Sequence, residues 1–170
     1  MKLFSGKVDI IAAEITRKLI ADESVETESP KEMEMDVAAV LREYIRTDRD
    51  LTDQAKDICE SKGLPYSSFP KLKRQMADKI FFKVGDDALD YIMDQIIGSM
   101  MHSQFVDEVF LEDHELKVIM RPIIKRHTEI EDEIDVEARQ KIKNLKEGTN
   151  EWEIEYNRAM EQVKNRRKLN

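Results

Sequence analysis

The stretch that decides the fold is LTDQAKDIC at residues 51–59, because its apolar pattern returns as IDVEARQKI at residues 134–142. This offset of 83 residues holds over a longer part of the chain, where apolar residues of the first half fall on apolar residues of the second. The matching pairs are Leu41 with Ile124, Leu51 with Ile134, Ala55 with Ala138, Cys59 with Ile142, Phe69 with Trp152 and Ile80 with Val163. A period of about 80 residues is longer than the 20–50 residues of a solenoid unit, so we interpret it as a duplicated small domain.

Each repeat begins with an apolar stripe, and the two stripes match at an offset of 81 residues. The matching pairs are Val8 with Leu89, Ile11 with Ile92, Ile15 with Ile96 and Leu19 with Met100. Spacings of three and four residues are typical of the buried face of a helix. The sequence therefore predicts an all-α fold of two tandem pseudo-symmetric repeats, residues 1–84 and 85–170. We expect them to form one compact unit and to pack on each other through their first helices.

Four segments of each repeat carry apolar residues at helical spacing, so we expect about four helices per repeat. The clearest helix start is residues 29–32, Ser-Pro-Lys-Glu, which has the composition of a capping box with proline in the first turn. The fourth helix of the first repeat is expected to turn Phe69 and Ile80 inward. The other predicted caps are Asp86, Thr52, Asp135 and Asn150, the last paired with Glu153.

Two irregular features interrupt this helical pattern. Residues 24–27 and 105–110 read as short extended segments, and we expect at most a short two-stranded pairing between them. Pro122 stands where the first repeat has Ala39. Because proline removes a backbone donor and clashes with the preceding turn, it should bend the helix that contains it.

The composition indicates a highly charged, soluble protein. Charged residues make up 38% and apolar residues 41% of the chain, and the net charge of −8 argues against nucleic-acid binding over the whole surface. The single Cys59 excludes an intrachain disulfide framework and fits a reducing compartment. We expect no signal peptide and no membrane span, and hence a cytoplasmic location.

The second repeat holds two distinctive motifs. The first is the segment IDVEARQKI at residues 134–142, and the second is GTNEWE at residues 148–153, followed by a charged helix that ends in KNRRK at residues 164–168. Over essentially its whole length the chain resembles the bacterial family known as domain of unknown function 507. The resemblance implies a bacterial, cytosolic, all-helical protein, and it brings no catalytic residues with it.

No motif in the sequence indicates an enzyme. A phosphate-binding glycine loop, a nucleophile elbow and a zinc-ligand spacing are all missing, so we expect no catalysis and no cofactor. The three histidines lie in the second repeat, where His127 and Glu131 are four residues apart. One histidine and one carboxylate do not make a metal site.

The candidate interaction residues lie in three groups. The basic end could follow the phosphates of a nucleic acid, face an anionic membrane, or complete a helix terminus. Trp152 is expected to be an apolar anchor of the last helix, and the methionine cluster could line a partner surface or the core. These residues are Lys164, Arg166, Arg167 and Lys168 at the basic end, Trp152, and Met100 with Met101.

Two functions remain open from the sequence. The leading one is a non-enzymatic protein-interaction or scaffold module that binds a protein partner or forms a homodimer. The alternative is a nucleic-acid-associated protein that uses the basic C-terminal helix.

Overall fold

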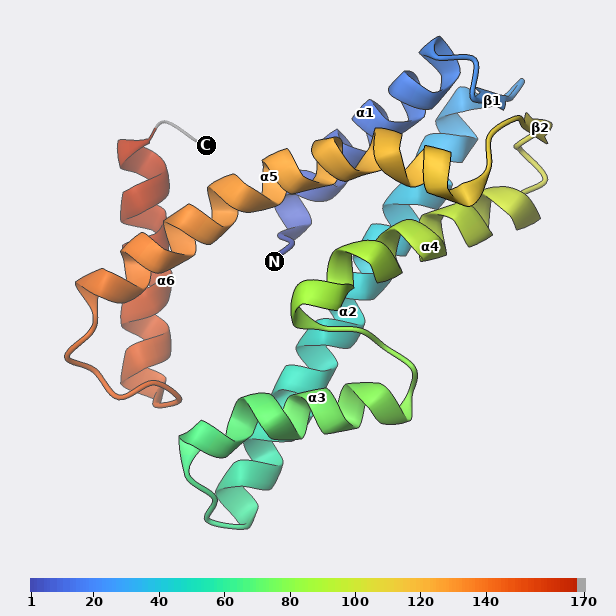
Figure 1. The fold of residues 1–170 in the computed structure, drawn as a ribbon. Helices are drawn as coiled ribbons and strands as arrows, with labels where there is room; N and C mark the ends of the chain where they lie inside the picture. The colour runs from blue at the N-terminus through green and yellow to red at the C-terminus, as the bar shows by residue number, and fades with distance from the viewer. Residues whose placement is uncertain (168–170) are drawn as a thin grey trace.

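The computed structural model describes residues 1–167, and within them it confirms the all-α class (Figure 1). Short 3-10 turns at Ser5–Lys7, Tyr66–Ser68 and Gly85–Asp87 precede three of the helices. A helix, a short strand, a long helix and a further helix follow each other twice in the same order. The helices are α1 (Val8–Ala21), α2 (Pro30–Ser61), α3 (Phe69–Lys79), α4 (Ala88–His102), α5 (Asp113–Lys141) and α6 (Asn150–Arg166).

The predicted extended segments do form a pairing. β1 (Val25–Glu26) and β2 (Glu108–Val109) are antiparallel, with Val25 opposite Val109. Thr27 extends the contact, since its hydroxyl donates a hydrogen bond to the carbonyl of Phe105 at 2.5 Å. The pairing ties together the two segments that lead into the long helices α2 and α5 (Figure 1).

The prediction of separate second and third helices is wrong, because each pair is one continuous helix. The hydroxyl of Thr52 donates to the carbonyl of Asp48, four residues back, at 2.8 Å, and so lies inside α2 without capping a helix. The carboxylate of Asp135 accepts hydrogen bonds from Lys2, Arg139 and Tyr156. Each half of the described chain therefore contains three α-helices, not four.

The starts of three helices also differ from the predicted caps. Ser29 and Pro30 do begin α2, but the Ser29 side chain makes no capping hydrogen bond, and neither does Asp87, the residue after Asp86, at the start of α4. At α6 the cap is Thr149, whose hydroxyl accepts from the backbone N–H of Trp152 at 3.2 Å.

A capping box forms at α5, where the sequence analysis did not expect one. The side chain of Glu112 accepts from the backbone of Glu115, and the side chain of Glu115 accepts from the backbone of Glu112. Acidic residues also stabilise this end of a helix through its dipole.

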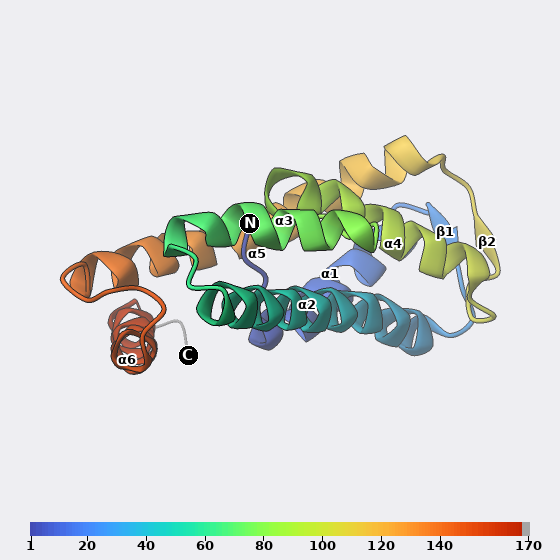
Figure 2. The same ribbon diagram turned by 90° about the horizontal axis from the view of Figure 1, so that it is seen from below.

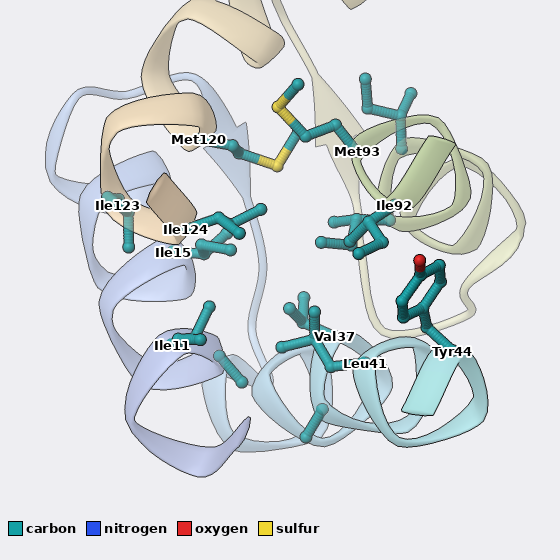
Figure 3. Close-up of a cluster of buried hydrophobic side chains, with 14 of the residues drawn as sticks. Ile11, Ile15, Val37, Leu41, Tyr44, Ile92, Met93, Met120, Ile123 and Ile124 are labelled. Atoms are coloured by element: carbon teal, nitrogen blue, oxygen red, sulfur yellow. The ribbon is translucent and has the colours of Figure 1, made fainter. Parts of the chain in front are cut away.

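The main core lies between four helices. α1 packs against both α2 and α5, and α4 packs against the same two helices. Figure 3 shows apolar side chains from all four helices meeting, with Met93 of α4 and Met120 of α5 directed toward one another. The first helix of each half thus contacts the long helix of the other half. This core draws residues from both sides of residue 84, so the two halves share it. The predicted domain boundary and the pseudo-twofold relation stay predictions.

The far halves of the long helices diverge and carry α3 and α6 as two arms (Figures 1 and 2). In one arm, α6 and the end of α5 share a second core, whose buried residues are Ile134, Ala138, Ile142, Ala159, Met160 and Val163. In the other arm, α3 packs against α2 and buries only Ala77. The inward position predicted for Ile80 is wrong. α3 ends at Lys79, and Ile80 is 55% exposed.

Candidate functional site

The basic end of the chain is neutralised by acidic residues of α5. The ammonium of Lys164 lies 3.7 Å from Glu131, and Arg167 pairs with Glu133 at 2.9 Å. Glu137 forms ion pairs with both Arg166 and Arg167. Lys168, the fourth predicted cation, lies outside the described residues. These ion pairs leave less positive charge for the phosphates of a nucleic acid than the sequence of this end indicates.

The methionine cluster divides between the core and the surface. Met100 is 2% exposed and belongs to the core, together with Met93. Met101 is 52% exposed at the end of α4. The spacing of Met93 and Met100 therefore reflects the buried face of α4, and of these three methionines only Met101 is exposed to a partner.

Trp152 is a half-buried residue at the edge of the second core. Its ring stacks on that of Tyr156, with centroids 4.8 Å apart, and the guanidinium of Arg139 lies 5.2 Å from its centroid. It also lines a cleft of about 600 Å³ between the two arms.

This inter-arm cleft is lined by pairs of residues that match at the 83-residue offset of the sequence repeat. Thr52 and Lys56 on α2 line it from one side, and their partners in the alignment, Asp135 and Arg139 on α5, line it from the other. An ion pair of 2.7 Å between Lys56 and Glu153 of α6 joins the two arms. The N-terminus lies between them (Figure 1).

The charged groups of the inter-arm cleft satisfy one another. Asp135 accepts from the ammonium of Lys2 at 3.0 Å, from Nε of Arg139 at 2.9 Å and from the hydroxyl of Tyr156. Burial alone would raise the pKa of Asp135, but these partners outweigh it and lower the pKa. Burial, followed by the same carboxylate, raises the pKa of Tyr156. Asp135 is thus ionised and Tyr156 protonated at neutral pH, which suits structural cross-linking better than proton transfer.

A second concave surface is an apolar groove of about 560 Å³ between α2 and α4. Tyr44, Phe82 and Tyr91 form its aromatic side. The rings of Tyr44 and Phe82 stack with centroids 4.8 Å apart, and Phe82 meets Tyr91 edge-on at 5.3 Å. We name this surface the α2–α4 groove, and its lining residues are Asp36, Ala39, Val40, Glu43, Tyr44, Thr47, Ile80, Phe82, Tyr91, Ile92, Gln95 and Ser99.

Phe81 follows α3 beside this groove in a conformation that favours glycine. Its φ of 56° is left-handed, and two hydrogen bonds close the helix end around it. These run from Phe81 N–H to the Asp78 carbonyl at 3.2 Å and from Phe82 N–H to the Ala77 carbonyl at 3.0 Å. At the end of α2 the equivalent position is Gly63, with a φ of 60°.

Phe81 therefore combines strain with exposure. A bulky residue held in the left-handed region costs about 1–3 kcal/mol, and the side chain of Phe81 is 84% exposed. Ile80 and Phe82 on either side of it both line the α2–α4 groove. This feature was not predicted from the sequence, although three consecutive large apolar residues at a helix end, Ile80, Phe81 and Phe82, were a signal for it.

Other kinds of site find little support in the part of the chain that the structure describes. Residues 1–167 contain no group of three or more His, Cys, Asp or Glu residues placed to hold a metal ion. Nε2 of His127 lies 3.0 Å from a carboxylate oxygen of Glu14. No helix within these residues has the length and apolar content needed to span a bilayer.

Comparison with known proteins gives a family without an assigned activity. A family model described as "Protein of unknown function (DUF507)" matches residues 1–169, which is essentially the whole chain. A search of curated proteins finds no match.

Proposed function

We propose that this chain, which belongs to the DUF507 family of proteins of unknown function, is a non-enzymatic interaction module whose α2–α4 groove binds an apolar segment of a protein chain. The bacterial cytosol is the setting that we propose for it. The buried, single Cys59 and the family resemblance support that setting.

The observation that carries the proposal is that Phe81 is exposed while its backbone is held in a left-handed conformation. Covering a phenylalanine side chain gains about 1.5–3 kcal/mol, which is comparable to the cost of its left-handed backbone. The isolated chain bears that cost without burying the ring, since Phe81 is 84% exposed. A protein that covers Phe81 and Ile80 would gain burial energy that offsets the cost of the left-handed backbone. The groove beside these residues offers aromatic and aliphatic surface for the contact.

The chemistry of the other surfaces favours this proposal over its alternatives. The ion pairs of Arg166 and Arg167 with Glu133 and Glu137 weaken the case for a nucleic-acid-associated protein. The mutual pairing of Lys2, Arg139 and Asp135 in the inter-arm cleft weakens the case for acid–base catalysis.

Photo-crosslinking tests the proposal. We expect p-benzoylphenylalanine at Phe81 and, in a second variant, at Ala39 in the groove to form adducts with the same protein in living cells. The purified adduct partner should bind the wild-type chain and lose binding to a Phe81→Ser variant. Val118, which is 71% exposed on α5 and does not line the groove, is the matched position for the control. Adducts equal to those at Val118, or binding unchanged by Phe81→Ser, would refute the proposal.

A further inference from the structure

We infer that the occupant of the α2–α4 groove is a second copy of this chain, which inserts the exposed side chain of Phe81 from residues 79–83 in a reciprocal exchange. We name residues 79–83 the hook. The inference rests on the proposed function and adds the identity of the partner, the segment that enters the groove and the symmetry of the assembly.

The hook has an apolar centre between two cations. Its sequence is Lys-Ile-Phe-Phe-Lys, with Lys79 and Lys83 at its ends. Ile80 and Phe81 are both exposed, and the left-handed backbone at Phe81 holds the hook at the end of α3. Lys83 pairs with Asp78 at 3.4 Å, but both side chains are about half exposed, so this pair is readily exchanged.

The groove offers the complementary chemistry. Its two charged lining residues, Asp36 and Glu43, are both acidic. Asp36 accepts the hydroxyl of Ser103 at 2.6 Å, and no cation of the described chain forms an ion pair with it. Glu43 pairs with Arg46 one helical turn away, and both side chains are exposed. The aromatic cluster supplies an apolar wall at the Tyr44 end of the groove, and its rings also attract cations.

The hook and the groove are neighbours on one surface, which is what twofold symmetry requires. In a symmetric dimer the same surface of each copy forms the interface, so that surface must complement itself. Ile80 and Phe82 line the groove of their own chain, whereas Phe81 between them is exposed to solvent. With a twofold axis beside the hook, Phe81 of each copy enters the α2–α4 groove of the other copy. Two anchors and up to four Lys–carboxylate contacts follow from a single contact geometry.

Sedimentation of the full chain tests the dimer. Across about 1–100 µM we expect a monomer–dimer equilibrium for the wild type. Phe81→Gly should raise the dimer dissociation constant at least about 100-fold, because each copy loses an aromatic anchor. Glycine relieves the left-handed strain, so this variant should remain folded. Val118→Ser removes another exposed apolar residue, 71% exposed and outside the groove, and should leave the constant unchanged.

Charge exchange tests the reciprocal geometry. Reversing the hook with Lys79→Glu and Lys83→Glu, or the groove with Asp36→Lys and Glu43→Lys, should make each variant monomeric, because like charges then face each other. An equimolar mixture of the two variants should form a heterodimer, since both of its contacts are again complementary. Circular dichroism checks that each variant is folded, and Phe81→Gly decides the question if either is not.

Two results would overturn the inference. One is a wild-type chain that stays monomeric over the whole range, and the other is a dimer that survives Phe81→Gly unchanged. If a different protein then crosslinks at Phe81 and Ala39, the proposed function stands while the homodimer is wrong. If Phe81 crosslinks no more than Val118, both fail. A dimer that forms only with phospholipid vesicles present would indicate a membrane contact and would also count against the inference.

Discussion

The ammonium of Lys164 lies 3.7 Å from Oε2 of Glu131, a carboxylate that is only 4% exposed. That oxygen has no hydrogen-bond partner within the described chain, so Lys164 is the cation that offsets its charge. The same ammonium lies 4.9 Å from the ring centroid of Phe4, which packs against the second core. Lys164 therefore stabilises the arm formed by α5 and α6, and its place in a basic run does not make it a binding residue.

Removing Lys164 should therefore destabilise the fold. Breaking a buried ion pair from one side costs about 3–5 kcal/mol. Lys164 is itself partly exposed, so we expect Lys164→Gln to cost about 1–3 kcal/mol in urea denaturation. The double variant Lys164→Gln, Glu131→Gln should recover most of the loss, because no unpaired charge remains. Additive effects of the two substitutions would contradict this pairing.

Trp152 should be a structural anchor. It stacks on Tyr156 and packs at the edge of the second core. Emptying a fully buried aromatic site costs about 3–5 kcal/mol, and because Trp152 is half-buried we expect Trp152→Ala to fall at the lower end of this range. Trp152→Phe keeps the stacking surface and should cost about half as much or less. A thermal midpoint that is unchanged in Trp152→Ala would show that the ring is free for a ligand.

Asp135 should make stability depend on pH in acid. Its folded-state pKa lies below the ordinary 3.8, so the unfolded chain takes up a proton first as the pH falls. The contribution of Asp135 to folding stability is complete above the ordinary pKa of 3.8, and it is lost as the pH falls through the lower pKa of the folded state. Asp135→Asn should be less stable by roughly 1–3 kcal/mol at pH 7, and its deficit should shrink below pH 3.8. A deficit that stays constant between pH 7 and pH 2.5 would be inconsistent with the network around Asp135.

The sequence predicted the helices better than it predicted their ends. Apolar spacing marks a buried face, as with Leu51 and Ala55, but it does not say whether the helix continues from the turn before. Thr52 and Asp135 have good capping side chains, yet they lie inside helices. No glycine or proline breaks α2 between Pro30 and Ser61, and in α5 Pro122 lies well before Asp135. Local composition allowed two outcomes there, and tertiary packing, of α2 on α1, α3 and α4 and of α5 on α1, α4 and α6, stabilises the continuous helices.

The candidate site was less predictable for a related reason. Ile80 aligns with Val163, which is fully buried on α6, and this alignment suggested an inward side chain. α3 ends at Lys79, whereas α6 continues to Arg166, so the two aligned residues lie in different local structures. The left-handed turn at Phe81 lacks the glycine that usually marks such a turn in a sequence. Likewise, the pairing of α6 cations with α5 carboxylates needs the tertiary structure to be seen.

Pro122 should impose a bend on α5. It lies inside this helix and leaves the carbonyl of Val118 without its usual donor. In a crystal structure we expect the axis of α5 to change direction there, while the matching part of α2 around Ala39 stays straight. Pro122→Ala should straighten the helix, and where the neighbouring packing accepts the change it should raise stability by up to about 3 kcal/mol. Equal straightness of α2 and α5 would show that the prediction is wrong.

Arg166 and Arg167 should contribute little to nucleic-acid binding. Because Lys164 has a structural role, the informative variant keeps it and replaces Arg166, Arg167 and Lys168 with Gln. Arg166 and Arg167 are exposed and paired with Glu133 and Glu137, so stability should change by no more than a few tenths of a kcal/mol per pair. We expect no salt-sensitive duplex binding by the wild type at near-physiological salt, because the carboxylates of α5 repel phosphates at the same surface. If this end does bind DNA, log–log salt titrations should show a slope that flattens by up to about 2.7 in the triple variant, at roughly 0.9 per contact. Micromolar binding by the wild type that disappears in this variant would favour the nucleic-acid function over the interaction module.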